Sequence, residues 1–177
     1  MHKTGVMLLL ATCLVAPVVV RAQSSPANPV VASAQEIFDR QSKYIMSAAE
    51  EMPGDKYGYR PTPDQWTFGK VVAHVAGSNF AVCALLSGMP APQNQKAAET
   101  DPKEKIIPVV KASFDFCSQA LAALQDSKLG DTVKFFGGRQ EPRARVLLEL
   151  TGDLEDHYSQ IADYLRQNGI VPPSAKK

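Results

Sequence analysis

An aspartate and a histidine stand four residues apart in the last long apolar stripe of the sequence, at Asp153 and His157. Side chains four residues apart on an α-helix share one face, so both would point toward the same neighbour. A carboxylate and an imidazole on a buried face are costly to desolvate unless a partner pairs with them. A divalent metal ion is one such partner, and His74 is available as a third ligand.

His74, Asp153 and His157 would form a ligand set of two histidines and one carboxylate, which suits zinc, nickel, iron or manganese. Three protein ligands leave a coordination position open for water or a substrate, as in catalytic rather than structural sites. The alternative is a hydrogen-bonded Asp–His pair on the helix, completed by His74 and holding no metal. The spacing alone leaves both interpretations open.

The first 22 residues have the pattern of a secretory signal peptide. Lys3 supplies the positive start, an uncharged apolar segment follows, and Val20-Arg21-Ala22 resembles a cleavage site for small residues. A lipoprotein signal that uses Cys13 is the weaker alternative, because the residues before it match a lipidation box poorly. We therefore expect export to the periplasm or the extracellular space, with no membrane attachment after cleavage.

Cleavage after Ala22 would leave 155 of the 177 residues, which is enough for one domain with its own core. The formal net charge would change from +1 to −1, because Lys3 and Arg21 are lost. Such a near-neutral chain without a basic run gives no support for nucleic-acid binding. Only two histidines would remain, and neither has a recognisable nucleophile nearby, so no Ser-His-Asp triad can be assembled.

Cys83 and Cys117 would remain as an even pair, which favours a disulfide in an exported protein. The bridge would join residues separated by 34 positions and stabilise the fold by about 3–4 kcal/mol in the chain-entropy description. Two buried free thiols are the alternative.

Amphipathic segments that would position these residues follow the expected signal peptide. Residues 23–32 are expected to be an irregular leader, and a first helix begins at Ser33, because Ser33 and Glu36 have capping-box spacing. A second helix carries His74, begins after Thr67 as its cap and ends at Gly88.

A third helix begins at Asp101-Pro102, with Asp101 as its cap and Pro108 inside it. A fourth begins near Pro142, carries Asp153 and His157, and ends at Asn168 before Gly169. Residues 126–141 read as a loop in which Phe135 and Phe136 form a short strand or pack beneath the helices. The pattern predicts an all-α protein, a four-helix bundle over residues 33–173 with residues 174–177 as a tail.

Three aromatic residues precede the second helix, Tyr57, Tyr59 and Trp66. We expect them to form a hydrophobic cover over one end of the bundle, with the mouth of a pocket as the alternative. Asp156 and Gln160 flank His157 and either orient it through hydrogen bonds or face solvent.

Two segments of the chain resemble the DinB-like family. The first extends from Lys56-Tyr57-Gly58-Tyr59-Arg60-Pro61 through Trp66-Thr67-Phe68 to Val71-Val72-Ala73-His74. The second contains His157-Tyr158-Ser159-Gln160-Ile161 and the tail Asn168-Gly169-Ile170-Val171-Pro172-Pro173. Their order and spacing carry the resemblance, which covers nearly all of the chain after the signal peptide and is closest to secreted members.

The resemblance implies a four-helix bundle with long crossover connections and a divalent metal held by three histidines. His74 matches the histidine of the second helix, and His157 matches the last residue of a His-x-x-x-His motif on the fourth. Asp153 departs from the pattern, because it stands where the family has the middle histidine.

The implied activity is that of a metal-dependent hydrolase or thiol-dependent transferase, in which the metal activates water or a thiol of a small-molecule substrate. The alternative is a non-catalytic bundle that binds a ligand or partner and keeps a degenerate metal site. Both the enzyme and the non-catalytic bundle are compatible with a homodimer.

Overall fold

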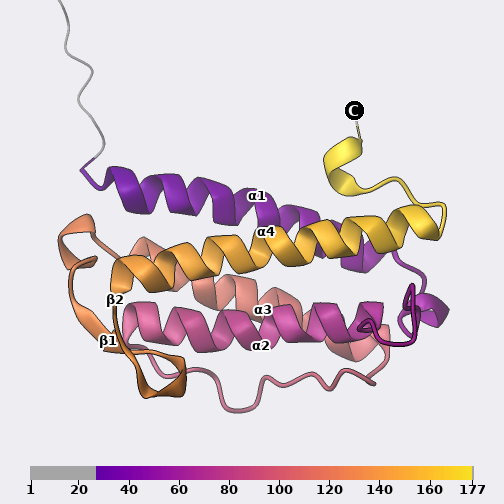
Figure 1. Cartoon of the computed structure of the whole chain (residues 1–177), viewed down its shortest axis with the longest axis horizontal. Helices are drawn as coiled ribbons and strands as arrows, with labels where there is room; N and C mark the ends of the chain where they lie inside the picture. The colour runs from indigo at the N-terminus through magenta and orange to yellow at the C-terminus, as the bar shows by residue number, and fades with distance from the viewer. Residues whose placement is uncertain (1–26, 177) are drawn as a thin grey trace, which may run out of the picture.

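The predicted helices are all present in the computed structural model, which describes residues 27–176, and they lie side by side as a bundle (Figure 1). Their bounds are Pro29–Glu51 (α1), Phe68–Ser87 (α2), Lys103–Ala122 (α3) and Arg143–Gln167 (α4). The all-α fold class is thereby confirmed. The expected signal peptide, residues 1–22, lies outside the described residues.

Each helix packs against two others in a closed arrangement. α1 contacts α3 and α4, and α2 likewise contacts α3 and α4. The connections from α1 to α2 and from α3 to α4 therefore join helices at diagonal positions of the bundle, as the long crossover connections of the prediction require. This arrangement also makes α2 and α4, which carry the candidate ligands, direct neighbours.

The core is built from the apolar faces of all the long helices. Among its largest fully buried side chains are Phe38, Ile45, Phe68, Leu86, Ile106, Leu121, Leu154 and Ile161. Burying one such side chain stabilises a fold by about 1.5–3 kcal/mol, so this core is the main source of the bundle's stability. α2 is apolar enough to cross a membrane by length and composition, but 61% of its most apolar window is buried inside the bundle.

The start of α1 differs from the prediction. The helix begins at Pro29, with Asn28 in the cap position, whereas the hydroxyl of Ser33 donates to the carbonyl of Pro29. The carboxylate of Asp126 accepts hydrogen bonds from the backbone N–H groups of Val30 and Val31, each at 2.9 Å. An acceptor so distant in sequence stabilises the helix start, so residues 29–32 are helical and not part of an irregular leader.

The starts of the next two helices test two capping predictions. Thr67 caps α2 as predicted, because its hydroxyl oxygen accepts from the N–H of Lys70 at 3.1 Å. α3 begins one residue later than expected, with Pro102 in the cap position. The carboxylate of Asp101 accepts instead from the N–H of Ala98 at 2.9 Å, which holds the preceding turn.

The connection before α4 contains a short antiparallel hairpin, formed by Thr132–Lys134 (β1) and Gln140–Pro142 (β2). Gly137 and Gly138 form its turn with φ of 71° and 79°, a conformation that favours glycine. Phe135 is buried beneath the helices, and Phe136 is exposed at the hairpin's end.

The predicted disulfide between Cys83 and Cys117 is present and links α2 to α3. The two Cα atoms are 5.2 Å apart, within the usual range for a bridge. Because the bridge closes a loop across the α2–α3 connection, it limits the freedom of the unfolded chain.

Replacing both Cys83 and Cys117 by alanine should lower the free energy of unfolding by about 3 kcal/mol, because the unfolded chain regains the entropy that the bridge removes. Urea titrations with and without reductant measure this loss. Reductant should shift the unfolding midpoint of the native protein and leave that of the double variant unchanged. An equal response of both proteins to reductant would contradict a stabilising bridge.

Candidate metal centre

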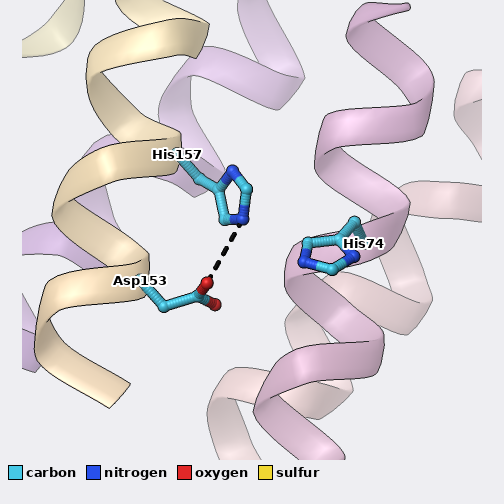
Figure 2. A group of neighbouring side chains, drawn as sticks. All are labelled: His74, Asp153 and His157. Carbon is cyan, nitrogen blue, oxygen red and sulfur yellow. Dashed lines mark ion pairs between the residues drawn. The ribbon is translucent and has the colours of Figure 1, made fainter. Parts of the chain in front are cut away.

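The packing of α2 against α4 brings the three candidate ligands together. Figure 2 shows Asp153 and His157 one turn apart on α4, both directed toward α2, with His74 facing them across the gap. One donor atom from each of these residues lies within 4.8 Å of the other two. Residues that are far apart in sequence thus form one cluster.

The spacing of two of the donor atoms matches that of two ligands on a single divalent cation. His157 Nε2 and Asp153 Oδ1 are 3.3 Å apart. Two ligands at 2.0–2.2 Å from a tetrahedral ion are separated by about 3.4 Å, so this pair already has the required spacing. Asp153 therefore reaches the same point as His157 despite its short side chain. His74 is exposed to solvent, which leaves its ring room to close the remaining gap.

Ser78 completes the surroundings of the carboxylate. Its hydroxyl donates a hydrogen bond of 2.7 Å to Asp153 Oδ2, while Oδ1 faces His157. Ser78 stands four residues after His74, so α2 and α4 each contribute a pair of residues with helical spacing. Ser78 was not predicted from the sequence as part of the site, although its spacing of four residues from His74 was the available signal.

The hydrogen bonds of the cluster favour the charged forms of Asp153 and His157. Burial opposes ionisation of Asp153, but hydrogen bonds from His157 and Ser78 outweigh it and lower its pKa. The hydrogen bond to Asp153 raises the pKa of His157 against the opposing effect of burial. Burial and the nearby His157 lower the pKa of His74, which keeps that ring neutral and able to act as a ligand.

The ring of Trp66 packs beside both histidines. Its ring centroid lies 5.0 Å from that of His74 and 6.3 Å from that of His157, and the latter pair is stacked at 19°. The ammonium of Lys70 lies 4.9 Å from the Trp66 ring. Trp66, from the segment just before α2, therefore lies beside the candidate ligands. Tyr57, in contrast, is buried in the core and donates to the carbonyl of Ala49.

A chain of hydrogen bonds holds Trp66 in place. Gln160 donates to the hydroxyl of Tyr164 at 3.1 Å, and that hydroxyl donates to the carbonyl of Trp66 at 2.9 Å. Gln160 thus supports the cluster, whereas Asp156 is exposed to solvent. The buried Nδ1 of His157 has no hydrogen-bond partner within the described residues.

The fold and the site together describe a helical-bundle protein with a candidate metal site of two histidines and one carboxylate. The DinB superfamily matches residues 37–161, and the chain belongs to this family. No curated protein sequence matches the chain significantly.

Solved structures share the fold. A DinB-like protein from Bacillus cereus is 18% identical, with a TM-score of 0.66 over 80% of this chain and 95% of its own. A DinB-like protein from Bacillus subtilis is also 18% identical, with a TM-score of 0.64 over 85% and 99%. A mutant of the mycothiol-dependent maleylpyruvate isomerase is 14% identical, with a TM-score of 0.61 over 74% and 60%.

Asp153→Asn should destabilise the chelator-treated protein more at pH 5.5 than at pH 9. The raised pKa of His157 stabilises the fold below about pH 6.5, and this stability is lost as pH rises through the folded-state pKa. The lowered pKa of Asp153 stabilises it above about pH 4, and this is lost as pH falls through the folded-state pKa. The pair therefore contributes most between these limits.

Urea unfolding of the native protein and the variant at both pH values measures this difference. Asp163→Asn is a matched control, because Asp163 is an exposed aspartate of the same helix that pairs with Arg166 at the surface. A loss of stability from Asp153→Asn that is equal at the two pH values would rule out the coupled pair.

Proposed function

We propose that the protein binds one divalent metal ion through His74, Asp153 and His157, and that it acts as a metal-dependent hydrolase or thiol-dependent transferase on a small molecule. The proposal rests on one observation: three donor atoms, contributed by two helices, lie within 4.8 Å of one another. The similarity to a mycothiol-dependent isomerase supports a thiol-dependent reaction at the level of the shared fold.

The residues around the site have separate roles in this proposal. His74 and His157 would supply nitrogen ligands, with His157 releasing its proton when the metal binds, and Asp153 would supply a negative charge that partly balances the cation. Ser78 orients the carboxylate, and Trp66 shields the histidine rings from water on one side. A bound divalent metal would lower the pKa of a coordinated water or thiol at the open position.

We further propose that the protein works outside the cytoplasm. The signal-peptide pattern of the first 22 residues supports export. The disulfide between Cys83 and Cys117 supports the same conclusion independently, because structural disulfides persist mainly in oxidising compartments.

A second candidate is a bundle that binds a ligand or partner and does not use a metal. It is favoured by one observation: Asp153 already has hydrogen-bond partners in His157 and Ser78. A carboxylate whose hydrogen bonds are satisfied in this way needs no metal as a partner. Asp153, at the position where the family resemblance implies a histidine, would then belong to the remnant of a lost metal site.

The chelator-treated protein should bind one equivalent of zinc or nickel, and His74→Ala should weaken that affinity at least about tenfold, because it removes one ligand. Isothermal titration calorimetry measures both values. Ser159→Ala, an exposed change on α4, serves as the control and should leave the affinity unchanged. Absence of binding, together with an unchanged melting temperature after metal addition, would contradict the metal centre.

Asp153→His separates the two candidates. In a functional metal centre, this variant restores the histidine that the family resemblance implies and should keep zinc binding at one equivalent, whereas Asp153→Ala should weaken it. In a degenerate site, only the histidine variant would bind zinc and the native protein would not. Equilibrium dialysis of the three proteins against zinc, followed by metal analysis, distinguishes these outcomes.

A further inference from the structure

A cavity of about 420 Å³ adjoins the metal centre, and His74, Ser78 and Asp153 form part of its wall. Its other walls come from three parts of the fold: small side chains of α2, Glu149 of α4, and Phe136 of the hairpin. A molecule in this cavity would lie directly beside the three candidate ligands. Its lining therefore indicates which kind of molecule the site accepts.

Small residues on α2 create the space. Gly77 and Ala81 line the cavity one turn apart, and a Cβ atom added at Gly77 would meet no atom within 4 Å. A larger side chain at position 77 would therefore extend into the cavity and fill part of it. Val82 adds an apolar surface to the same wall.

Phe136 supplies an apolar aromatic wall of the cavity from the hairpin. Its side chain is 51% exposed, while the adjacent Phe135 is buried and anchors the hairpin. An exposed aromatic ring at the edge of a cavity is a surface for the apolar part of a ligand. The crossover connection from α3 to α4 thus contributes directly to the site.

The charged residues of the lining are both acidic. Glu149 stands four residues before Asp153, so α4 presents Glu149, Asp153 and His157 along one face. Asp153 is engaged by Ser78 and His157, whereas Glu149 pairs with Arg145 in a half-exposed ion pair. Exposed pairs of this kind contribute little free energy, so a ligand cation could replace Arg145 at small cost.

We infer that this cavity is the substrate site and that it accepts small amines with an apolar group, the ammonium lying at Glu149 and the apolar group against Phe136. The inference rests on the proposed function, because it takes the reacting atoms of the substrate to lie beside the metal. Recognition of the amine itself depends on Glu149, Phe136 and the open space at Gly77, and it should be measurable without metal.

Three ligands with one aromatic ring and different end groups test the inference: phenethylamine, phenethyl alcohol and 3-phenylpropionate. Calorimetry and amide chemical shifts measure their binding to the chelator-treated and the zinc-treated protein. Phenethylamine should bind at least about tenfold more tightly than the alcohol, which corresponds to one charge-assisted contact, and the carboxylate should bind most weakly. The shifts should concentrate at Gly77, Ala81 and Gly137.

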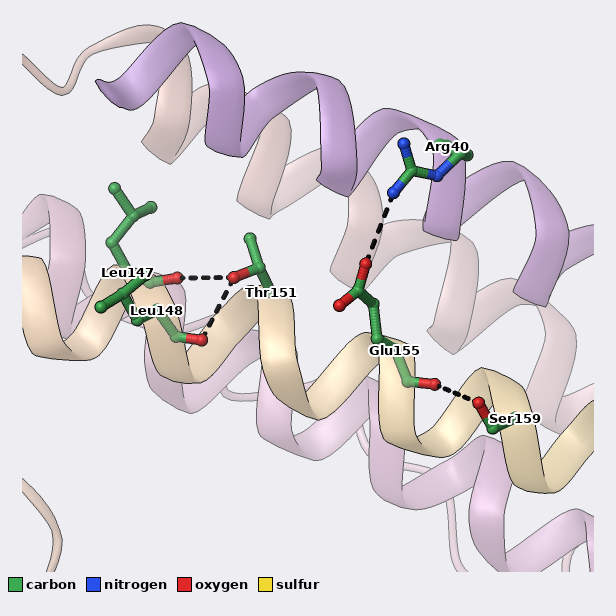
Figure 3. A network of polar contacts seen from close by, with 6 residues as sticks. All are labelled: Arg40, Leu147, Leu148, Thr151, Glu155 and Ser159. Atoms are coloured by element: carbon green, nitrogen blue, oxygen red, sulfur yellow. Dashed lines mark hydrogen bonds and ion pairs between the residues drawn. The ribbon is translucent and has the colours of Figure 1, made fainter. Parts of the chain in front are cut away.

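Two variants and one control locate the binding. Glu149→Gln should abolish the preference for the amine, and Gly77→Leu should block all three ligands by filling the cavity. Glu155→Gln is the matched control, because Glu155 lies on the same helix but reaches toward Arg40 of α1, at 3.4 Å, on a different face (Figure 3). That control should bind phenethylamine as the native protein does.

Equal affinity for the amine and the carboxylate, or an amine preference that survives Glu149→Gln, would overturn the inference. The two proposals fail separately. A protein that prefers the amine but binds no zinc would retain the ligand site and lose the proposed metal function. A protein that binds zinc but does not discriminate among the three ligands would retain the metal centre and lose the inferred substrate class.

Discussion

The contact of the Asp153 carboxylate with both His157 and Ser78 is the interaction on which the site depends. One oxygen faces His157 on the same helix, and the other accepts from Ser78 on α2, so the carboxylate links the two helices. It lies on a partly buried surface where an unpaired charge would be costly. The link joins α2 to α4 one turn away from His74.

The bundle makes this contact geometrically available. Because α2 and α4 are neighbours, residues separated by more than half of the described chain meet across one interface. The disulfide between Cys83 and Cys117 fixes α2 to α3 on its other side. A helix held by a covalent bond on one side and by a polar contact on the other is a rigid support for the candidate ligand His74, because rigid elements position site residues more accurately than loops.

Patterns of neighbouring residues predicted the helices. The features that the sequence did not predict depend on contacts between residues that are distant in the chain. The cap at Thr67, the end of α2 at Gly88 and the apolar stripe of α4 follow from residues close in sequence. The start of α1 at Pro29 depends on Asp126, and the position of Trp66 over the histidines depends on Tyr164. Asp153 was recognisable as a candidate ligand, but its distance to His157 and its bond to Ser78 emerge only from helix packing.

A crystal of the protein grown with zinc, and analysed by anomalous scattering at the zinc edge, tests directly whether the three residues hold a metal ion. The proposed metal centre predicts one peak about 2.0–2.2 Å from a nitrogen of His74, a nitrogen of His157 and a carboxylate oxygen of Asp153. A structure in which Asp153 keeps its hydrogen bonds to His157 and Ser78, and no zinc lies between α2 and α4, would contradict it.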